Sequence, residues 1–112
     1  MSTFELKVAK DGGFYFNLTG SVPRSVLLSG EKHPTREAAL HAIDRVKRNA
    51  VVDERYEKRV SGANRHFFVL NGDDGQALGT SARFETEAER DSAVGELKRA
   101  APEAKVDDRS GS

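Results

Sequence analysis

Apolar side chains alternate with polar or small ones near the start of the chain, over residues 4–8. This period of two is typical of a half-buried strand. Residues 11–13, Asp-Gly-Gly, come next, and residues 14–18 then resume the alternation. Because glycine accepts the positive φ that tight turns need, the pattern predicts a β-hairpin. A further turn over residues 20–23 and a short third strand over residues 25–28 are expected after it.

The same order of elements returns in the second half of the chain. Strands are predicted over residues 56–61, 66–71 and 76–80, with an Asn-Gly-Asp-Asp-Gly turn at residues 71–75. At an offset of 52 residues, identical residues fall on matching strand positions. These pairs are Glu5/Glu57, Val8/Val60, Phe16/Phe68, Leu18/Leu70, Gly20/Gly72 and Ser29/Ser81. Such self-similarity indicates a tandem duplication.

A helix follows the strands in each half. Thr86 begins a capping-box pattern with Glu89, and Thr35 can cap the first helix in a similar way. After one gap the offset between the halves is 51. Apolar residues then recur at helical spacing over residues 39–50 and 93–101, which predicts two amphipathic helices with narrow, alanine-rich stripes.

Two details of the alignment concern the borders of the sheet. Leu6 corresponds to Lys58, so a charge replaces an apolar side chain on a strand face that is expected to be buried. We expect this position of the second half to lie near an edge. Residues 51–53 and 104–106 follow the two predicted helices at equivalent places, and each can form a short extra strand.

A unit of three strands, a helix and a short strand, used twice, resembles the YegP-like family of small bacterial and archaeal proteins. That family is named as a domain of unknown function. Residues 71–84 are similar to its Asn-Gly turn, third strand, Thr-Ser step and following aromatic. Residues 46–50, Val-Lys-Arg-Asn-Ala, resemble its helix-end signature, and residues 4–5 and 56–57 resemble its repeat openings. The resemblance covers residues 3–107.

The resemblance implies a β₃-α-β unit used twice in one sheet, with the last strand of each unit crossing to the other. We therefore expect an α+β fold, with one antiparallel-dominated sheet and two helices on one face. A single domain is expected over residues 1–107, with repeat one at 3–54, repeat two at 55–107 and a disordered polar tail at 108–112. Residues 32–33, Lys-His, stand where the family has an aromatic, so a site that depends on that position would be lost from repeat one.

Charge and composition narrow the classes of function. Lys and Arg total 18 and Asp and Glu total 18, so the formal net charge is zero. This balance removes the general attraction to phosphate or anionic lipid that a basic protein has. The absence of cysteine excludes a disulfide framework, a thiolate metal site and a cysteine nucleophile. No signal peptide and no run near the roughly 18 apolar residues of a membrane span is found, so we expect a cytoplasmic protein without a membrane partner.

The residues that most often carry chemistry show no recognised catalytic or metal-binding pattern. His33, His41 and His66 are not spaced three or four residues apart, as helix-borne metal ligands are. His66 aligns with Phe14 in a strand, so packing or solvent-facing imidazoles are expected. No catalytic, cofactor-binding or metal-ligating residue is assigned.

The sheet face away from the helices is the candidate interaction surface. With Phe16 and Leu18 directed at the helices, the residues that alternate with them point the other way. This open face would carry an aromatic and a cation from each repeat. Its candidate residues are Lys7, Tyr15, Asn17, Arg59, Phe67 and Val69.

An open face of this kind resembles, in principle, a base-stacking surface. The balanced charge, with Glu5 and Glu57 on the same face, favours instead a surface where a second molecule docks. We therefore predict a non-enzymatic interaction module without a cofactor, with an unidentified protein or a second copy as partner. Single-stranded nucleic-acid binding is the alternative, and an enzyme using His66 or the Ser81 region is the third hypothesis. A monomer with an internal pseudo-dimer is expected.

Overall fold

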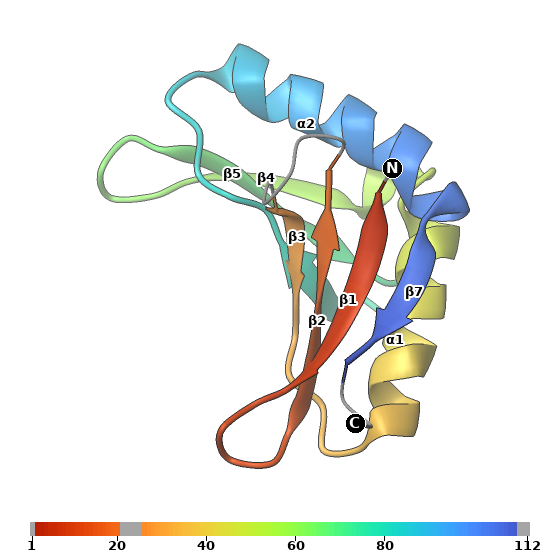
Figure 1. Cartoon of the computed structure of the whole chain (residues 1–112). Helices are drawn as coiled ribbons and strands as arrows, with labels where there is room; N and C mark the ends of the chain where they lie inside the picture. Colours follow the sequence, from red (N-terminus) through yellow and green to blue (C-terminus); the bar gives the residue numbers. More distant parts are fainter. Residues whose placement is uncertain (1, 21–25, 110–112) are drawn as a thin grey trace.

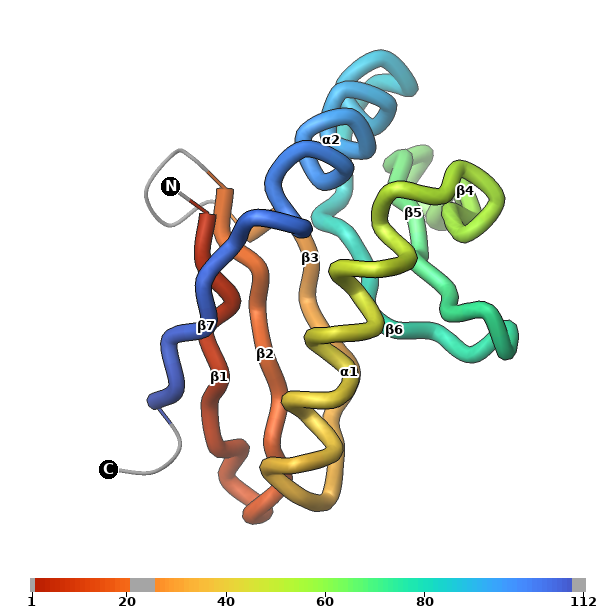
Figure 2. The backbone as a smooth tube through the Cα atoms, turned by 90° about the vertical axis from the view of Figure 1, so that its right-hand side faces the viewer, coloured from red at the N-terminus to blue at the C-terminus, as the bar shows by residue number. Residues whose placement is uncertain are grey.

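The computed structural model describes residues 2–20 and 26–109, and these residues form one sheet with two helices on one of its faces (Figure 1). Figure 2 looks onto the helices, with the strands behind them. The elements are β1 Thr3–Val8, β2 Phe14–Thr19, β3 Val26–Gly30, α1 Arg36–Asn49, β4 Tyr56–Val60, β5 His66–Asn71, β6 Ala77–Thr80, α2 Glu87–Ala100 and β7 Lys105–Asp108. Two short 3-10 helices, η1 Asp53–Arg55 and η2 Ala101–Glu103, follow α1 and α2.

The strand order across the sheet is β4-β5-β6-β3-β2-β1-β7. Neighbouring strands are antiparallel, except that β7 runs parallel to β1. The expected α+β fold, with an antiparallel-dominated sheet and both helices on one face, is therefore confirmed. The pairing register shifts between Leu18 and Thr19 in repeat one and between Leu70 and Asn71 in repeat two. The turn expected over residues 20–23 lies largely outside the described residues.

The core lies between the sheet and the two helices, and it repeats the same aromatic contact in each half. The Phe4 and Phe16 rings pack edge to face with centroids 5.9 Å apart, and Tyr56 and Phe68 do so at 5.3 Å. Edge-to-face packing places the positive ring edge on the negative ring face. The side chains of Phe4, Phe16 and Phe68 are fully buried, as the alternation predicted.

Side-chain caps begin both helices. The Thr35 hydroxyl accepts a hydrogen bond from the Ala38 N–H at 3.0 Å, and the Thr86 hydroxyl accepts one from the Glu89 N–H at 3.1 Å. Each cap satisfies one of the N–H groups that a helix leaves unpaired at its start. The Glu89 carboxylate accepts from the Thr86 hydroxyl at 3.2 Å, so the predicted capping pair closes through side chains.

The two extra strands have different outcomes. Residues 104–106 were expected to form one, and β7 begins at Lys105 and continues to Asp108, which the sequence placed in the polar tail. The prediction of a strand at residues 51–53 is wrong, because η1 follows there instead. A strand at residues 51–53 would be the counterpart of β7, so it would have to run parallel to β4. This segment joins β4 directly, whereas two parallel neighbouring strands need a crossover connection of about a dozen residues. Only the last strand of the second unit therefore crosses to the other repeat.

β4 is consequently an outer strand of the sheet, as the Leu6/Lys58 mismatch predicted. Lys58 lies opposite the buried Phe68 across the β4–β5 pair, so its side chain points to the helix face. There the Lys58 ammonium lies 3.1 Å from the Asp91 carboxylate of α2. The charge that Lys58 brings to the helix face of this edge strand is thus matched by a carboxylate of α2.

Candidate functional site

The six residues predicted for the open face lie on that side of the sheet in the structure, but Val69 is buried there, with only 6% of its surface exposed. Side chains that are directly opposite in paired strands share a face, and Lys7 lies opposite Tyr15 just as Arg59 lies opposite Phe67. Asn17 and Val69 follow two residues after the two aromatics, and so they point the same way. In the described part of the chain both helices lie on the other side of the sheet (Figure 2).

One row of side chains crosses six strands of this face. The register pairs Asn17 with Ser29, Ser29 with Thr80, and Thr80 with Val69. The complete row, from β1 to β4, is Glu5, Asn17, Ser29, Thr80, Val69 and Glu57. Both ends are glutamates from equivalent positions of the two repeats, and the two central residues, Ser29 and Thr80, are small and polar, whereas Val69 is apolar and buried. The row therefore follows the internal symmetry of the protein.

The strand register also corrects one match of the sequence alignment. The alignment made Ser29 and Ser81 equivalent. In the structure, however, Ser29 pairs with Asn17 as Thr80 pairs with Val69, so Thr80 is the equivalent of Ser29. The offset of 51 therefore applies already in the third strand of each repeat. Ser81 is buried, whereas Ser29 is exposed on the open face.

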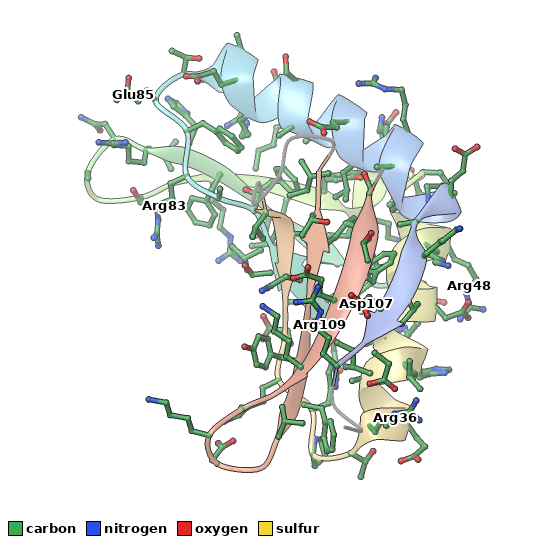
Figure 3. The ribbon with its side chains drawn as sticks, in the orientation of Figure 1. Arg36, Arg48, Arg83, Glu85, Asp107 and Arg109 are labelled. Atoms are coloured by element: carbon green, nitrogen blue, oxygen red, sulfur yellow. The ribbon has the colours of Figure 1, made fainter. Side chains whose placement is uncertain are left out.

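The glutamate at the β1 end of the row belongs to a small charge network. Glu5 lies 3.5 Å from the Lys7 ammonium and 3.5 Å from the Arg109 guanidinium. Arg109 also donates to the Asp107 carboxylate at 2.9 Å, and this hydrogen bond holds the pKa of Arg109 above its ordinary value. Figure 3 shows Asp107 and Arg109 side by side at this end of the sheet.

The glutamate at the β4 end is paired in the same way. Arg59 donates from Nε to Glu57 at 2.8 Å, and Asn71 donates from its amide to the same carboxylate at 3.2 Å. The hydrogen bond from Arg59, followed by that from Asn71, holds the pKa of Glu57 below its ordinary value. Lys7 and Arg59, the two predicted cations, are thus both matched by carboxylates, so neither presents an unbalanced positive charge to a phosphate.

The structure does not bring the two predicted aromatics together. Tyr15 precedes Asn17 on β2 and Phe67 precedes Val69 on β5, and these strands run in opposite directions. The two rings therefore lie on opposite sides of the polar row. Three interstrand steps of about 4.8 Å separate their strands, or roughly 14 Å across the sheet. They form two separate patches, not one continuous stacking platform.

Two arginines of this face were missed by sequence reasoning. The Arg83 guanidinium lies 5.6 Å from the centroid of the Phe67 ring, a cation–π geometry. Arg83 lies between β6 and α2, where no periodicity marks a side-chain direction. Arg109 lies in the segment expected to be a tail, yet its N–H donates to the Leu6 carbonyl of β1 at 2.8 Å. The only feature of the sequence that could have indicated Arg109 is its place shortly after the predicted short strand near the C-terminus.

The residues of the enzyme hypothesis are engaged in structural contacts. The Ser81 hydroxyl accepts from the Phe68 N–H at 2.9 Å and donates to the Ala82 carbonyl at 2.8 Å. His66 and Phe84 exchange two backbone hydrogen bonds of 2.7 Å, which fix the His66 backbone in the sheet. Within residues 2–20 and 26–109, no three His, Asp or Glu side chains gather in a way that could hold a metal ion.

A hollow of about 520 Å³ lies on the helix side of the sheet, away from the open face. Apolar side chains line much of it, among them Leu27, Phe84 and Ala93. Glu89 and Glu96 of α2 are its carboxylates, and the lining contains no histidine, lysine or arginine to act beside them. The hollow therefore does not assemble a catalytic group of residues.

Fold and surface together define a small tandem-repeat α+β protein with a mixed-charge sheet face that no helix of the described residues covers. The family described as Domain of unknown function (DUF1508) matches residues 9–57 and again residues 61–108. The two matches begin 52 residues apart, which is the offset of the internal repeat. The chain belongs to this family, as its resemblance to YegP-like proteins had suggested.

Individual relatives agree with this assignment. The chain is 38% identical over 104 residues to the "UPF0339 protein in ptx operon 5'region" of Stutzerimonas stutzeri, covering 93% of each chain. It is 35% identical over 107 residues to UPF0339 protein PA0329 of Pseudomonas aeruginosa, covering 96% of each. The solution structure of the protein of unknown function yegP from E. coli matches with a TM-score of 0.91 at 27% identity, covering 99% of this chain and 95% of that one. UPF0339 protein SO3888 from Shewanella oneidensis shares the fold, with a TM-score of 0.90 at 24% identity over 97% and 92% of the two chains.

Among the described residues, no helix is long and apolar enough to cross a bilayer.

Proposed function

We propose that this protein is a non-enzymatic interaction module that binds another protein through the open face of its sheet. The observation that carries the proposal is the row from Glu5 to Glu57, which runs across six strands without a covering helix in the described chain. Strands of both repeats contribute to this surface, which therefore extends across six of the seven strands of the sheet. Half-buried aromatics beside polar side chains are the composition that protein interfaces favour.

The charges of the face support a protein over a nucleic acid as partner. Lys7, Arg59 and Arg109 each lie within 3.5 Å of a carboxylate. Such a surface offers opposite charges at short intervals, which complement the mixed charges of a protein surface. A phosphate backbone would meet the carboxylates of Glu5 and Glu57 wherever it approached those cations.

Site-specific photo-crosslinking tests the proposal in the cells that express the protein. A photoreactive phenylalanine analogue at Tyr15 should give a discrete protein adduct. The matched control carries the analogue at His41, an exposed position on α1. Identical adducts from both positions, or adducts at Tyr15 that nuclease removes, would contradict the proposal.

Single-stranded nucleic-acid binding is the second candidate, and the stack of Arg83 on Phe67 is the observation in its favour. If it holds, an unstructured oligonucleotide should bind with a salt slope of about −0.7 per phosphate neutralised. The Tyr15→Ala/Phe67→Ala variant should then lose about 1–3 kcal/mol per stacked base. The protein-interaction proposal expects no such salt-sensitive binding, so fluorescence anisotropy with a labelled oligonucleotide decides between the two.

A further inference from the structure

The outer edge of β4 has no strand partner among residues 2–20 and 26–109. The equivalent edge of β1 is occupied by β7, which places Val106 opposite Phe4. The difference arises because the counterpart of β7 in repeat one joins β4 directly and forms η1 instead. The internal symmetry therefore leaves one strand position of the sheet empty.

The backbone of β4 directs hydrogen-bonding groups to this empty position. The Ser61 N–H donates to the Arg65 carbonyl of the neighbouring strand's connection at 2.8 Å. Because backbone groups alternate in direction along a strand, those of Glu57 and Arg59 also point to β5, like those of Ser61.

The groups that point outward belong to the alternate residues of β4. Lys58 and Val60 present both an N–H and a C=O at the edge. Tyr56 presents its C=O, since its N–H already donates to the Asp53 carbonyl at the end of η1. Val60 is also 55% exposed, so the edge carries an uncovered apolar side chain beside its free backbone groups.

We infer that a second copy of this chain pairs with β4 in antiparallel orientation, about a two-fold axis at Lys58. The backbone groups of Lys58 then exchange two hydrogen bonds with those of Lys58 in the second copy. The Val60 N–H donates to the Tyr56 carbonyl of the second copy, and symmetry repeats this bond. Glu57 lies opposite Arg59 of the second copy, in a non-hydrogen-bonded pair. In an antiparallel sheet, the side chains of such pairs approach each other most closely.

The charges of β4 select this register. Moving the pairing one step in one direction places Glu57 opposite its own copy, and one step in the other direction places Arg59 opposite its own copy. Like charges that are directly opposite destabilise paired strands, whereas opposite charges stabilise them. The register centred on Lys58 also places one like-charged pair face to face, Lys58 and its own copy, but it is the one that in addition pairs Glu57 with Arg59 twice. It also makes the interface self-complementary, as a two-fold axis requires.

The helix side of the junction fits the same arrangement. Val60 of the second copy would lie opposite Tyr56, just as Val106 lies opposite Phe4 at the other edge. A hollow of about 200 Å³ lies beside that position, and its lining consists of Tyr56, Val94 and four charged side chains, those of Asp53, Lys58, Asp91 and Lys98. The two Lys58 side chains meet on this face, and each is matched by Asp91 of its own copy at 3.1 Å. The remaining repulsion and the small number of bonds make the association weak and reversible.

Charge exchange across the junction provides the test. Arg59→Glu places a carboxylate opposite Glu57 of the second copy, and Glu57→Arg places a guanidinium opposite Arg59. Each variant should dissociate about tenfold more readily than the unchanged protein, because both attractive pairs become repulsive. An equimolar mixture of the two variants should regain association, since every facing pair in the mixed dimer has opposite charges.

Sedimentation velocity over a concentration series measures all of these species. The matched control is Arg48→Glu, which makes the same change of charge at an exposed position of α1 and not on β4 (Figure 3). It should associate like the unchanged protein. Recovery in the mixture also shows that both variants are folded. An unchanged protein that stays monomeric at every concentration, single variants that associate normally, or a mixture that does not recover would each overturn the inference.

Discussion

Gly30 and Gly79 lie opposite each other in the short β3–β6 pairing, where the strands of the two repeats join in one sheet. A Cβ atom on Gly79 would lie 2.8 Å from the Ser29 carbonyl oxygen and 2.8 Å from Leu28 Cγ. Backbone on one side and a buried side chain on the other leave no room to move aside. The junction between the repeats therefore depends on close backbone approach at this pair.

Substitution at the junction should weaken the whole protein. We expect Gly79→Ala to lower the free energy of unfolding by about 1–3 kcal/mol, as overpacking of a tight site does. The control is Gly62→Ala in the β4–β5 turn, where an added Cβ meets nothing within 4 Å. That variant should stay within about 0.5 kcal/mol of the unchanged protein. Urea titration of both variants checks the prediction, and equal stabilities would contradict it.

The two faces of the sheet should differ in their sensitivity to truncation. Phe16→Ala and Phe68→Ala should each cost about 3–5 kcal/mol, because both side chains are fully buried. Tyr15→Ala and Phe67→Ala should cost clearly less, since these half-buried rings lie on the open face. Denaturant titration of the four variants measures the order. A larger loss at Tyr15 or Phe67 would mean that the open face is a second core.

The first repeat should not fold alone as a monomer. A fragment that ends at Asp53 lacks β6, the partner of β3, and β7, the partner of β1. It also has only about 50 residues, few for an independent core. We expect this fragment to be unfolded or dimeric by circular dichroism and sedimentation. A folded monomer at micromolar concentration would contradict the shared-sheet architecture.

Stability should fall in mildly acidic solution because of His33. Burial, opposed by the nearby Glu31 carboxylate, lowers the pKa of His33 from its ordinary 6.5. Well above pH 6.5 the imidazole is neutral in both the folded and the unfolded chain, so His33 does not lower the free energy of unfolding there. As the pH falls below that value, the unfolded chain binds the proton first, so stability is lost progressively towards the lowered folded pKa.

Replacing His33 by phenylalanine, the residue at the equivalent position of the second repeat, checks this pH dependence. Phe14 pairs with His33 as His66 pairs with Phe84, so a phenylalanine at position 33 matches the residue type of the other repeat. His33→Phe should flatten the decline of the urea midpoint between about pH 7.5 and about pH 5.5. His41→Gln, at an exposed helix position, should leave the decline unchanged. The same decline in all three proteins would show that His33 is not its source.

Local patterns predicted three strands and a helix in each repeat, together with the direction of most of their side chains. Alternation identified the strands and the buried Phe16 and Phe68, and threonine caps identified the helix starts. The mismatch between Leu6 and Lys58 even identified an edge, because a charge on a buried face needs access to solvent. These signals work because side-chain direction, capping and turns depend on residues within a few positions of each other.

Strand partners and registers were decided only by the tertiary structure. The sequence placed Ser29 against Ser81, but pairing through β3 and β6 aligns Ser29 with Thr80. It also allowed two extra strands, of which β7 alone had a long enough connection to reach a parallel partner. Arg83 and Arg109 joined the open face for the same reason, since their places depend on contacts between distant segments. Local periodicity carries no information about such contacts, because they depend on how the connections bring separate strands side by side.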